Sequence, residues 1–417
     1  MRKPDLSSPT RTILPALWGF AFLSYLLRTN IAVAQQFMAR ELSLDTIQVG
    51  YIFTAFLVGY TIFQVPAGIL GDRFGPRVVL LITGLGWATT TLFTGVTPGL
   101  LIRNSAAALV ALLVIRFLHG IEESATYPVA MTAVSAWFPA SQYALLNSLI
   151  FTGSTLGAAF GPPLVASLMN SFGWRATFYW TALLPLVLAL IWWNVTPGRP
   201  DRGVSERAGF ADGSWRALLL KWNVLLLSLS YLLYCYAISI FVYWLFKYLV
   251  DVRHLSVVNG GWATSLPWIV ASGAVPLFGY LTNGVSHRIG KLPGRRLVAA
   301  SCLVIAAALM FAGAEAVHLS TALVTISLSV GLLFSTEAPY WSTAIDLAPD
   351  HSGAASGLMN LAGNLGGVLS TLLVPVLVTY FGWFIALLSG SVFALFGALL
   401  WFFIRAEPQA SLTSLVD

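Results

Sequence analysis

The chain has 417 residues, of which 58% are hydrophobic and 9% are charged, with a mean hydropathy of +0.81 and a net charge of +6. A water-soluble domain carries about 25% charged residues, so this composition excludes a soluble fold and indicates a protein of the lipid bilayer. A membrane β-barrel is also excluded, because its short strands alternate apolar and polar residues, whereas the apolar runs here are continuous. The sequence therefore predicts an all-α integral membrane protein.

Twelve apolar stretches, each close to the roughly 20 residues that a membrane-spanning helix needs, follow one another along the chain. We predict spans at 14–37, 47–70, 78–98, 106–137, 144–170, 174–194, 222–249, 258–284, 297–316, 319–345, 353–379 and 382–404. Ala32-Val33-Ala34 resembles a signal-peptidase site. Eleven further spans follow it, so we interpret 14–37 as a retained first helix.

Basic residues gather in every second loop. With the N-terminus inside, 15 of the 22 Lys and Arg residues lie in inner loops and tails and 5 in outer loops, while Arg28 and Arg116 lie within spans. The positive-inside rule then places both termini in the cytoplasm of a multi-pass protein of the inner or plasma membrane. Topology explains the net charge, so we expect the lipid bilayer and no nucleic acid as a partner.

The second half of the chain repeats features of the first. Gly-Ile-Leu-Gly-Asp-Arg at 68–73 is echoed by Gly-Tyr-Leu-Thr-Asn at 279–283, and Phe-Gly-Trp at 172–174 recurs at 381–383, with offsets of 211 and 209 residues. We therefore divide the chain into a six-helix half at 1–195, a cytoplasmic linker at 196–220 and a second six-helix half at 221–417. Such repeats are typical of secondary transporters, which bind substrate near mid-membrane between the halves.

Other chemistries find little support in the sequence. Cys235 and Cys302 lie in spans without a CxxC motif or a His/Cys cluster, so we interpret both as packing residues and predict no metal site. Gly284 to Lys291 has the wrong spacing for a phosphate-binding loop, and the common hydrolase motifs do not occur. We expect no enzyme, no catalytic residues and no cofactor.

Few charged residues lie well inside the predicted spans, and Arg28 is the most informative of them. An arginine there costs about 2.5–3.5 kcal/mol on insertion scales, which implies a partner or a water-filled cavity. Its planar guanidinium binds a carboxylate through two parallel hydrogen bonds. The alternative is a structural ion pair with Glu123 or Glu337.

The fourth span carries several polar side chains on different faces. At about 100° per residue, Arg116, Glu123 and Tyr127 share one face while Glu122 points away from it. We predict that Glu123 faces the cavity and exchanges a proton, and that Glu122 pairs with a neighbouring helix. For His119 we weigh a proton relay against hydrogen-bonded packing and favour packing.

The residues from Gly68 to Arg77 read Gly-x-x-x-Asp-Arg-x-Gly-Pro-Arg, which resembles the helix 2–3 loop of the major facilitator superfamily. Further blocks in both halves are similar to that superfamily's organic-anion symporters, which include sugar-acid:proton symporters, sialic-acid carriers and vesicular glutamate carriers. These blocks are Tyr25 to Asn30 with Val33-Ala34, Gly59-Tyr60 with Gln64 to Gly68, Arg116 with Gly120, Glu123 and Tyr127-Pro128, Gly161 to Leu164, Gly173 to Arg175, Trp341 with Asp346 and Pro349, and Ser356 to Asn360 with Gly363 to Gly367.

The resemblance implies the major facilitator fold, with twelve transmembrane helices in two pseudo-symmetric six-helix halves, and it implies roles for particular residues. Arg28 would hold the substrate carboxylate and Glu123 would be the coupling carboxylate. The cavity positions that could bind a hydroxylated acid are Tyr25, Tyr60, Gln64, Tyr127, Trp341, Asn360 and Asn364. For Trp341 and Asn364, helix packing is an equal alternative, and Tyr231 and Tyr234 are weaker cavity candidates.

Further implied roles concern the inner face and the stoichiometry. Gly68, Asp72, Arg73, Gly75 and Arg77 would form a conformational latch that helps to hold the outward-open state. Leu27 stands where many sugar-acid symporters have an aspartate, which puts two-proton coupling through helix 1 in doubt. Glu337, which the repeat places opposite the fourth span, is our candidate for a second proton-coupling carboxylate.

The sequence therefore predicts a monomeric secondary transporter that couples a small organic anion to a proton by alternating access. The anion we expect is a hydroxylated carboxylate such as a sugar acid. One alternative is uptake or export of a larger carboxylated metabolite such as a siderophore. The other is a membrane sensor with the same fold that does not transport.

Overall fold

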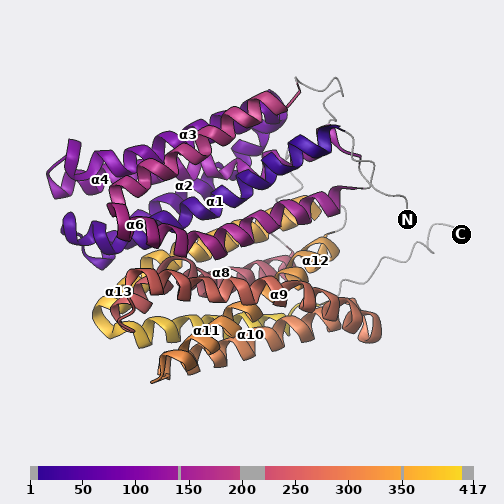
Figure 1. Cartoon of the computed structure of the whole chain (residues 1–417). Coiled ribbons are helices and arrows are strands. Elements are labelled where there is room, and N and C mark those ends of the chain that lie inside the picture. The colour runs from indigo at the N-terminus through magenta and orange to yellow at the C-terminus, as the bar shows by residue number, and fades with distance from the viewer. Residues whose placement is uncertain (1–7, 140–141, 198–220, 349–351, 406–417) are drawn as a thin grey trace, which may run out of the picture.

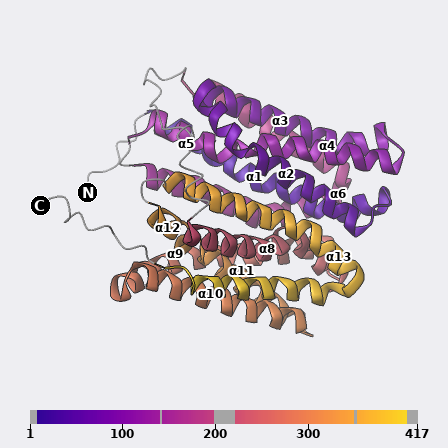
Figure 2. The same cartoon turned by 180° about the vertical axis from the view of Figure 1, so that it is seen from behind.

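The computed structural model describes residues 8–139, 142–197, 221–348 and 352–405, and in these ranges the chain is helical with no β-strand. The helices run side by side along one direction (Figures 1 and 2). The first group comprises α1 (Ser8–Glu41), α2 (Thr46–Phe74), α3 (Pro76–Val96), the π-helical turn η1 (Thr97–Leu101), α4 (Ser105–Ser124), α5 (Thr126–Trp137) and α6 (Tyr143–Val195). The second comprises α8 (Trp222–Asp251), α9 (Val257–Ile289), α10 (Lys291–Glu315), α11 (Leu319–Ser335), α12 (Glu337–Leu347) and α13 (Ser352–Trp401).

Ten segments of the described chain are long and apolar enough to cross a membrane. Two of them, of 50 and 48 residues, are twice the length of a span, and each bends at a glycine with non-helical backbone angles, Gly173 in α6 and Gly382 in α13. Dividing these two at their glycines gives twelve spans. The prediction of twelve is thereby confirmed, with α4–α5 and α11–α12 each forming one interrupted span.

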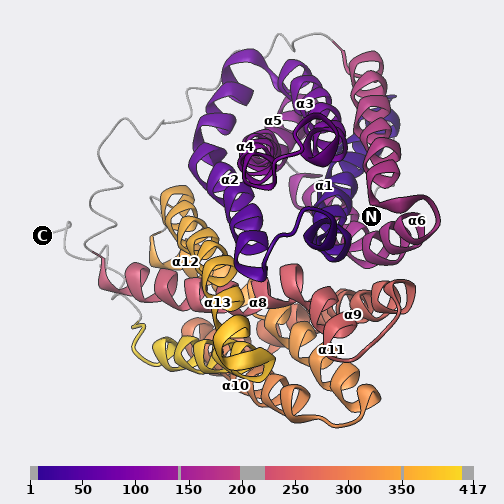
Figure 3. The same ribbon diagram turned by 90° about the vertical axis from the view of Figure 1, so that its left-hand side faces the viewer.

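The helices form two bundles, which Figure 3 shows from one end. The helix bounds give six spans to each bundle. In the first bundle α1 and α3 pack along α6, and α2 packs against α4; in the second, α8 and α10 pack along α13, and α9 packs against α11. The bundles meet where α6 contacts α9 and where α13 contacts α2. Most of the predicted linker at 196–220 lies outside the described residues, which omit 198–220. The domain boundary therefore stays a prediction. Pro349 also lies outside the described residues.

The two bundles repeat one another in their backbone. Gly173 and Gly382, 209 residues apart, have φ angles of 80° and 83°. Ser43 and His254 both have a φ of 54°, which is uncommon for residues with a side chain. A repeated apolar pattern therefore folds twice into the same bends, and this agrees with the tandem repeat in the sequence.

The bundles are joined by side-chain hydrogen bonds at one face of the molecule. We call the face where α1 ends and α2 begins the far face, and the opposite one, where α1 begins and α13 ends, the terminal face. At the far face Gln36 Nε2 donates to Asp251 Oδ1 at 3.0 Å, and the hydroxyls of Thr54 and Thr371 lie 2.8 Å apart. The structure is therefore closed at the far face.

Close helix contact within each bundle depends on glycine. A Cβ on Gly366 of α13 would overlap the backbone oxygen of Leu232 in α8, and one on Gly157 of α6 would overlap that of Phe22 in α1. These two contacts lie about 210 residues apart on both sides, so the same glycine contact holds the first and fifth spans together in each half.

We expect Gly366→Leu to destabilise the second bundle by about 1–3 kcal/mol, because the new side chain must push α13 away from α8. Thermal unfolding of the purified protein in detergent measures this. Gly357→Leu on the same helix is the matched control, since its Cβ meets open space, and it should melt close to the wild type. Equal melting temperatures for the two variants would contradict the packing described here.

Candidate functional site

A buried ion pair joins the first and fourth spans near the middle of the molecule. Arg28 Nε lies 2.5 Å from Glu123 Oε1, and Ser24 Oγ donates to the same oxygen at 2.6 Å. The Arg28 side chain is 14% exposed and that of Glu123 is fully buried. Ser24 stands one helical turn before Arg28, so α1 presents both donors to one carboxylate oxygen.

Aromatic rings surround the Arg28 guanidinium. Its carbon lies 4.9 Å from the ring centre of Tyr25, 5.3 Å from that of Phe56 and 5.2 Å from that of Tyr60. Cation–π attraction at these distances stabilises a positive charge whose hydration is reduced. Of these three rings, Tyr25 and Tyr60 were predicted at the cavity, while Phe56 was not.

A second buried arginine lies behind this pair. Arg116 is 3% exposed and its guanidinium carbon lies 4.9 Å from the ring centre of Phe56, on the ring that also faces Arg28. Its Nε has no hydrogen-bond partner. The first half thus holds two buried arginines close to one buried glutamate, which favours the binding of an anion.

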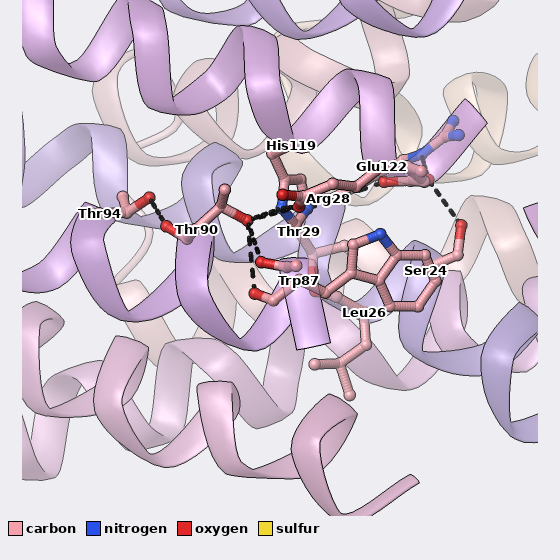
Figure 4. A network of polar contacts seen from close by, with 11 residues as sticks. Ser24, Leu26, Arg28, Thr29, Trp87, Thr90, Thr94, His119 and Glu122 are labelled. Carbon is pink, nitrogen blue, oxygen red and sulfur yellow. Dashed lines mark hydrogen bonds and ion pairs between the residues drawn. The ribbon is translucent and has the colours of Figure 1, made fainter. Parts of the chain in front are cut away.

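Glu122 and His119 both contact Thr90 of α3, in the network that Figure 4 shows. Thr90 Oγ1 lies 2.9 Å from Glu122 Oε2 and 2.8 Å from His119 Nδ1. Glu122 therefore contacts the neighbouring helix, and the His119 ring is 1% exposed and hydrogen-bonded on one nitrogen.

The second half contributes a carboxylate held by neutral donors. Glu337 accepts hydrogen bonds from Tyr234 at 2.9 Å, from Tyr231 at 3.2 Å and from Trp341 Nε1 at 2.7 Å. It stands in the first turn of α12, where the positive end of the helix dipole stabilises a negative charge. Trp341 thus touches Glu337, and its position one turn after Glu337 on α12 explains the contact.

Arg28 and Glu337 line one cavity between the two bundles, with an empty volume of about 630 Å³ including its open part. The cavity wall draws on both halves and is largely aromatic or aliphatic. The lining residues are Tyr25, Arg28, Leu57, Tyr234, Cys235, Ile238, Ser239, Val242, Tyr243, Trp268, Phe334, Glu337, Gly363, Asn364 and Gly367. Tyr243, Trp268 and Cys235 were missed by the sequence analysis, which read Cys235 as a packing residue.

The remaining predicted cavity residues divide into two groups. Gln64 Oε1 accepts hydrogen bonds from Asn360 at 3.0 Å and Asn364 at 3.1 Å, so this amide cluster links the halves beside the cavity. Tyr127 is not among the lining residues, and its hydroxyl lies 2.6 Å from that of Ser154.

The predicted latch residues contact partners of their own half in this structure. Asp72 accepts a hydrogen bond from Thr132 at 3.2 Å, and Arg77 donates to the backbone oxygen of Trp193 at 2.8 Å. The Arg73 guanidinium lies 5.4 Å from the Phe74 ring centre. Gly75, with a φ of 83°, forms the turn between α2 and α3, and Gly68 lies against Pro128. Asp72 is exposed at the terminal face.

Comparison with known proteins gives consistent results. A sequence model of the Major Facilitator Superfamily matches residues 17–371. The hexuronate transporter of Bacillus subtilis is 30% identical over 374 residues, covering 87% of this chain and 86% of that protein. The probable sulfoacetate transporter of Cupriavidus necator is 30% identical over 392 residues, with coverage of 88% and 86%. A bacterial homologue of the human lysosomal transporter Spinster, solved in an inward-facing, unoccupied conformation, superposes with a TM-score of 0.81 at 17% identity, covering 95% and 98%.

The two cysteines should differ in reactivity, because Cys235 lines the cavity and Cys302 is 1% exposed in a helix interface. We expect a water-soluble maleimide to label Cys302→Ala, which keeps Cys235, and to leave Cys235→Ala largely unmodified. Mass spectrometry of the native protein in detergent measures both. Faster labelling of Cys302 than of Cys235 would show that the cavity does not open as described.

Proposed function

The chain belongs to the Major Facilitator Superfamily, and from that membership we propose that it carries a small organic anion together with a proton by alternating access. It is a membrane transporter and not an enzyme. The observation that supports proton-coupled anion transport most directly is the buried Arg28–Glu123 pair at the edge of a cavity between the two halves.

The anion we propose is a hydroxylated carboxylate such as a sugar acid. A guanidinium in a poorly hydrated site binds a carboxylate or a similar planar anion strongly. The amide cluster of Gln64, Asn360 and Asn364 and the cavity tyrosines supply partners for hydroxyl groups. Relatives named as hexuronate and probable sulfoacetate transporters support an acidic substrate.

Coupling follows from competition for Arg28. While Glu123 is ionised, it occupies Arg28 and opposes an incoming anion. Protonation of Glu123 and binding of a substrate carboxylate to Arg28 therefore favour each other, because each removes the competition for the guanidinium. Glu337 lies across the same cavity and is the second candidate carboxylate for proton coupling, since Leu27 supplies none beside Arg28.

We propose that the transporter alternates between two states, one closed at the far face and one closed at the terminal face. The positive-inside rule assigns the terminal face to the cytoplasm, so this structure would be open to the cytoplasm. In the opposite state the bundles would close around the exposed Asp72, and with Arg73 and Arg77 it would then act as the latch. We propose a monomer in the cell membrane as the transporting unit.

Uptake into proteoliposomes tests this function. The labelled acids are glucuronate, gluconate, succinate, sulfoacetate and a ferric siderophore, each with and without a pH gradient. We expect a small carboxylate to accumulate when the gradient drives protons in the same direction, and a protonophore to abolish this accumulation. If no acid moves faster than in empty liposomes, the proposed function is wrong; selective movement of the siderophore would favour the larger substrate.

Variants of the ion pair should separate binding from coupling. Arg28→Ala should abolish uptake and exchange, and Arg28→Lys should reduce both about tenfold or more, because a lysine cannot reproduce two parallel charged hydrogen bonds. Glu123→Gln should keep substrate exchange between the two sides and lose gradient-driven accumulation. If Glu337→Gln still shows full accumulation, Glu337 does not take part in proton coupling. If Arg28→Ala still shows normal uptake, the proposed mechanism is wrong.

A further inference from the structure

We propose that protons reach Glu123 through a buried relay formed by Glu122, Thr90 and His119, and not through the cavity that receives the anion. The relay lies inside the first bundle, between α3 and α4 (Figure 4). This inference rests on the proposed proton coupling and adds the path by which the proton travels.

The first links of the relay are formed by one hydroxyl. Thr90 Oγ1 lies 2.9 Å from Glu122 Oε2 on one side and 2.8 Å from His119 Nδ1 on the other. It also lies 3.0 Å from the backbone oxygen of Gly86, which accepts its proton when the relay is idle. The Thr90 and His119 side chains are buried, whereas the Glu122 side chain is 21% exposed at the surface of the bundle. We therefore place the outer end of the relay at Glu122.

The two oxygens of Glu123 face different surroundings. Oε1 accepts hydrogen bonds from Arg28 and Ser24 at 2.5 and 2.6 Å. Oε2 has no partner and lies 3.9 Å from His119 Nε2, which has none either. Unpartnered buried polar atoms are rare and call for an explanation. Here one donor and one acceptor face each other across a gap about 1 Å longer than a hydrogen bond.

Binding of the anion supplies the movement that closes this gap. While Arg28 holds Oε1, the carboxylate of Glu123 is fixed on the cavity side. An anion that takes over Arg28 releases the carboxylate, and a small rotation of Glu123 then brings Oε2 within hydrogen-bond distance of His119. The anion and the proton therefore approach Glu123 from opposite sides.

Residue Gly86 of α3 is an independent sign that Glu122 is held in place. A Cβ on Gly86 would lie 2.5 Å from the carboxyl carbon of Glu122 and 2.7 Å from Oε1. The carboxyl group thus occupies the space of the missing side chain and is kept beside Thr90. A glutamate that served only to meet solvent or lipid would not need this space.

The proton transfer balances without any further reactant. A proton on Glu122 moves to Thr90 Oγ1 as the Thr90 hydroxyl proton moves to His119 Nδ1, and the proton on His119 Nε2 moves to Glu123 Oε2. Glu122 ends ionised, Glu123 ends protonated, and Thr90 is unchanged. His119 ends in the other neutral tautomer, and proton transfer in the reverse direction, from Glu123 back to Glu122, restores the first.

The charged surroundings of His119 favour this neutral form of transfer. Arg28 on α1 and Arg116 on α4 are the nearby cations, and Glu122 and Glu123 are the nearby carboxylates. Trp87 from α3 and Phe56 from α2 flank the ring, with ring centres 6.4 and 5.9 Å away. Burial of the ring, together with the two nearby arginines, opposes a lasting imidazolium, so the imidazole passes a proton on rather than storing it.

Proteoliposomes test the relay with His119→Asn and Thr90→Val. The probe is labelled glucuronate, or whichever acid of the panel above the wild type exchanges fastest. We expect gradient-driven accumulation to fall about tenfold or more, while exchange without a pH gradient remains close to wild type. Thr90→Ser should restore accumulation because it keeps the hydroxyl. Thr89→Val is the matched control, since Thr89 bonds only to the backbone of its own helix.

A second readout follows Glu123 directly. After a pH jump in the presence of the same acid, time-resolved infrared spectroscopy of the purified protein follows the carboxylic acid band that Glu123→Gln removes. The relay predicts slower protonation of Glu123 in His119→Asn and Thr90→Val than in Thr89→Val. Unchanged rates and unchanged accumulation would overturn the relay, and an equal loss of exchange and accumulation would show a structural role instead. Absence of any wild-type exchange would count against the proposed function, with the infrared rates still deciding the relay.

Discussion

The buried ion pair between Arg28 and Glu123 is the interaction on which the other features of the site depend. Removing one partner from such a pair typically costs 3–5 kcal/mol, because the remaining charge is left unpaired in a medium of low polarity. Neither residue can therefore change its charge or partner alone. When an anion binds Arg28 or a proton binds Glu123, the other residue must therefore change its partner or its charge as well.

The two halves share the same backbone bends, but they do not share the same charged side chains. Bends at Gly173 and Gly382 and the interrupted fourth and tenth spans recur in both halves. The ion pair does not recur, since the second half presents Glu337 to tyrosines and a tryptophan instead of an arginine. The shared backbone supplies two matching walls, and the unequal side chains give the first half the ionic chemistry and the second half neutral hydrogen bonding.

The sequence predicted those features that follow from a single helix. Long apolar runs identified the twelve spans, and the 100° step between residues put Glu123 on the face that meets Arg28 and turned Glu122 toward another helix. The sequence did not predict which residues of different helices are in contact. Nothing in the spacing of α3 indicates that Thr90 meets His119, or that Trp268 reaches the cavity. Tyr127 follows a break at Ala125, where the backbone bonds back to Glu122, so a continuous helical phase does not fix its position, and its role in the cavity stays a prediction.

In the proposed cycle, coupling comes from the states that the buried charges exclude. Two states leave neither Arg28 nor Glu123 with an unpaired charge: Arg28 with ionised Glu123, or Arg28 with a bound anion and protonated Glu123. A carrier with an anion but no proton, or a proton but no anion, leaves one charge unpaired at a cost of about 3–5 kcal/mol. Such states are populated at least about a hundredfold less. A carrier that reorients mainly in these two paired states moves one proton with each monoanion. The symport is then electroneutral.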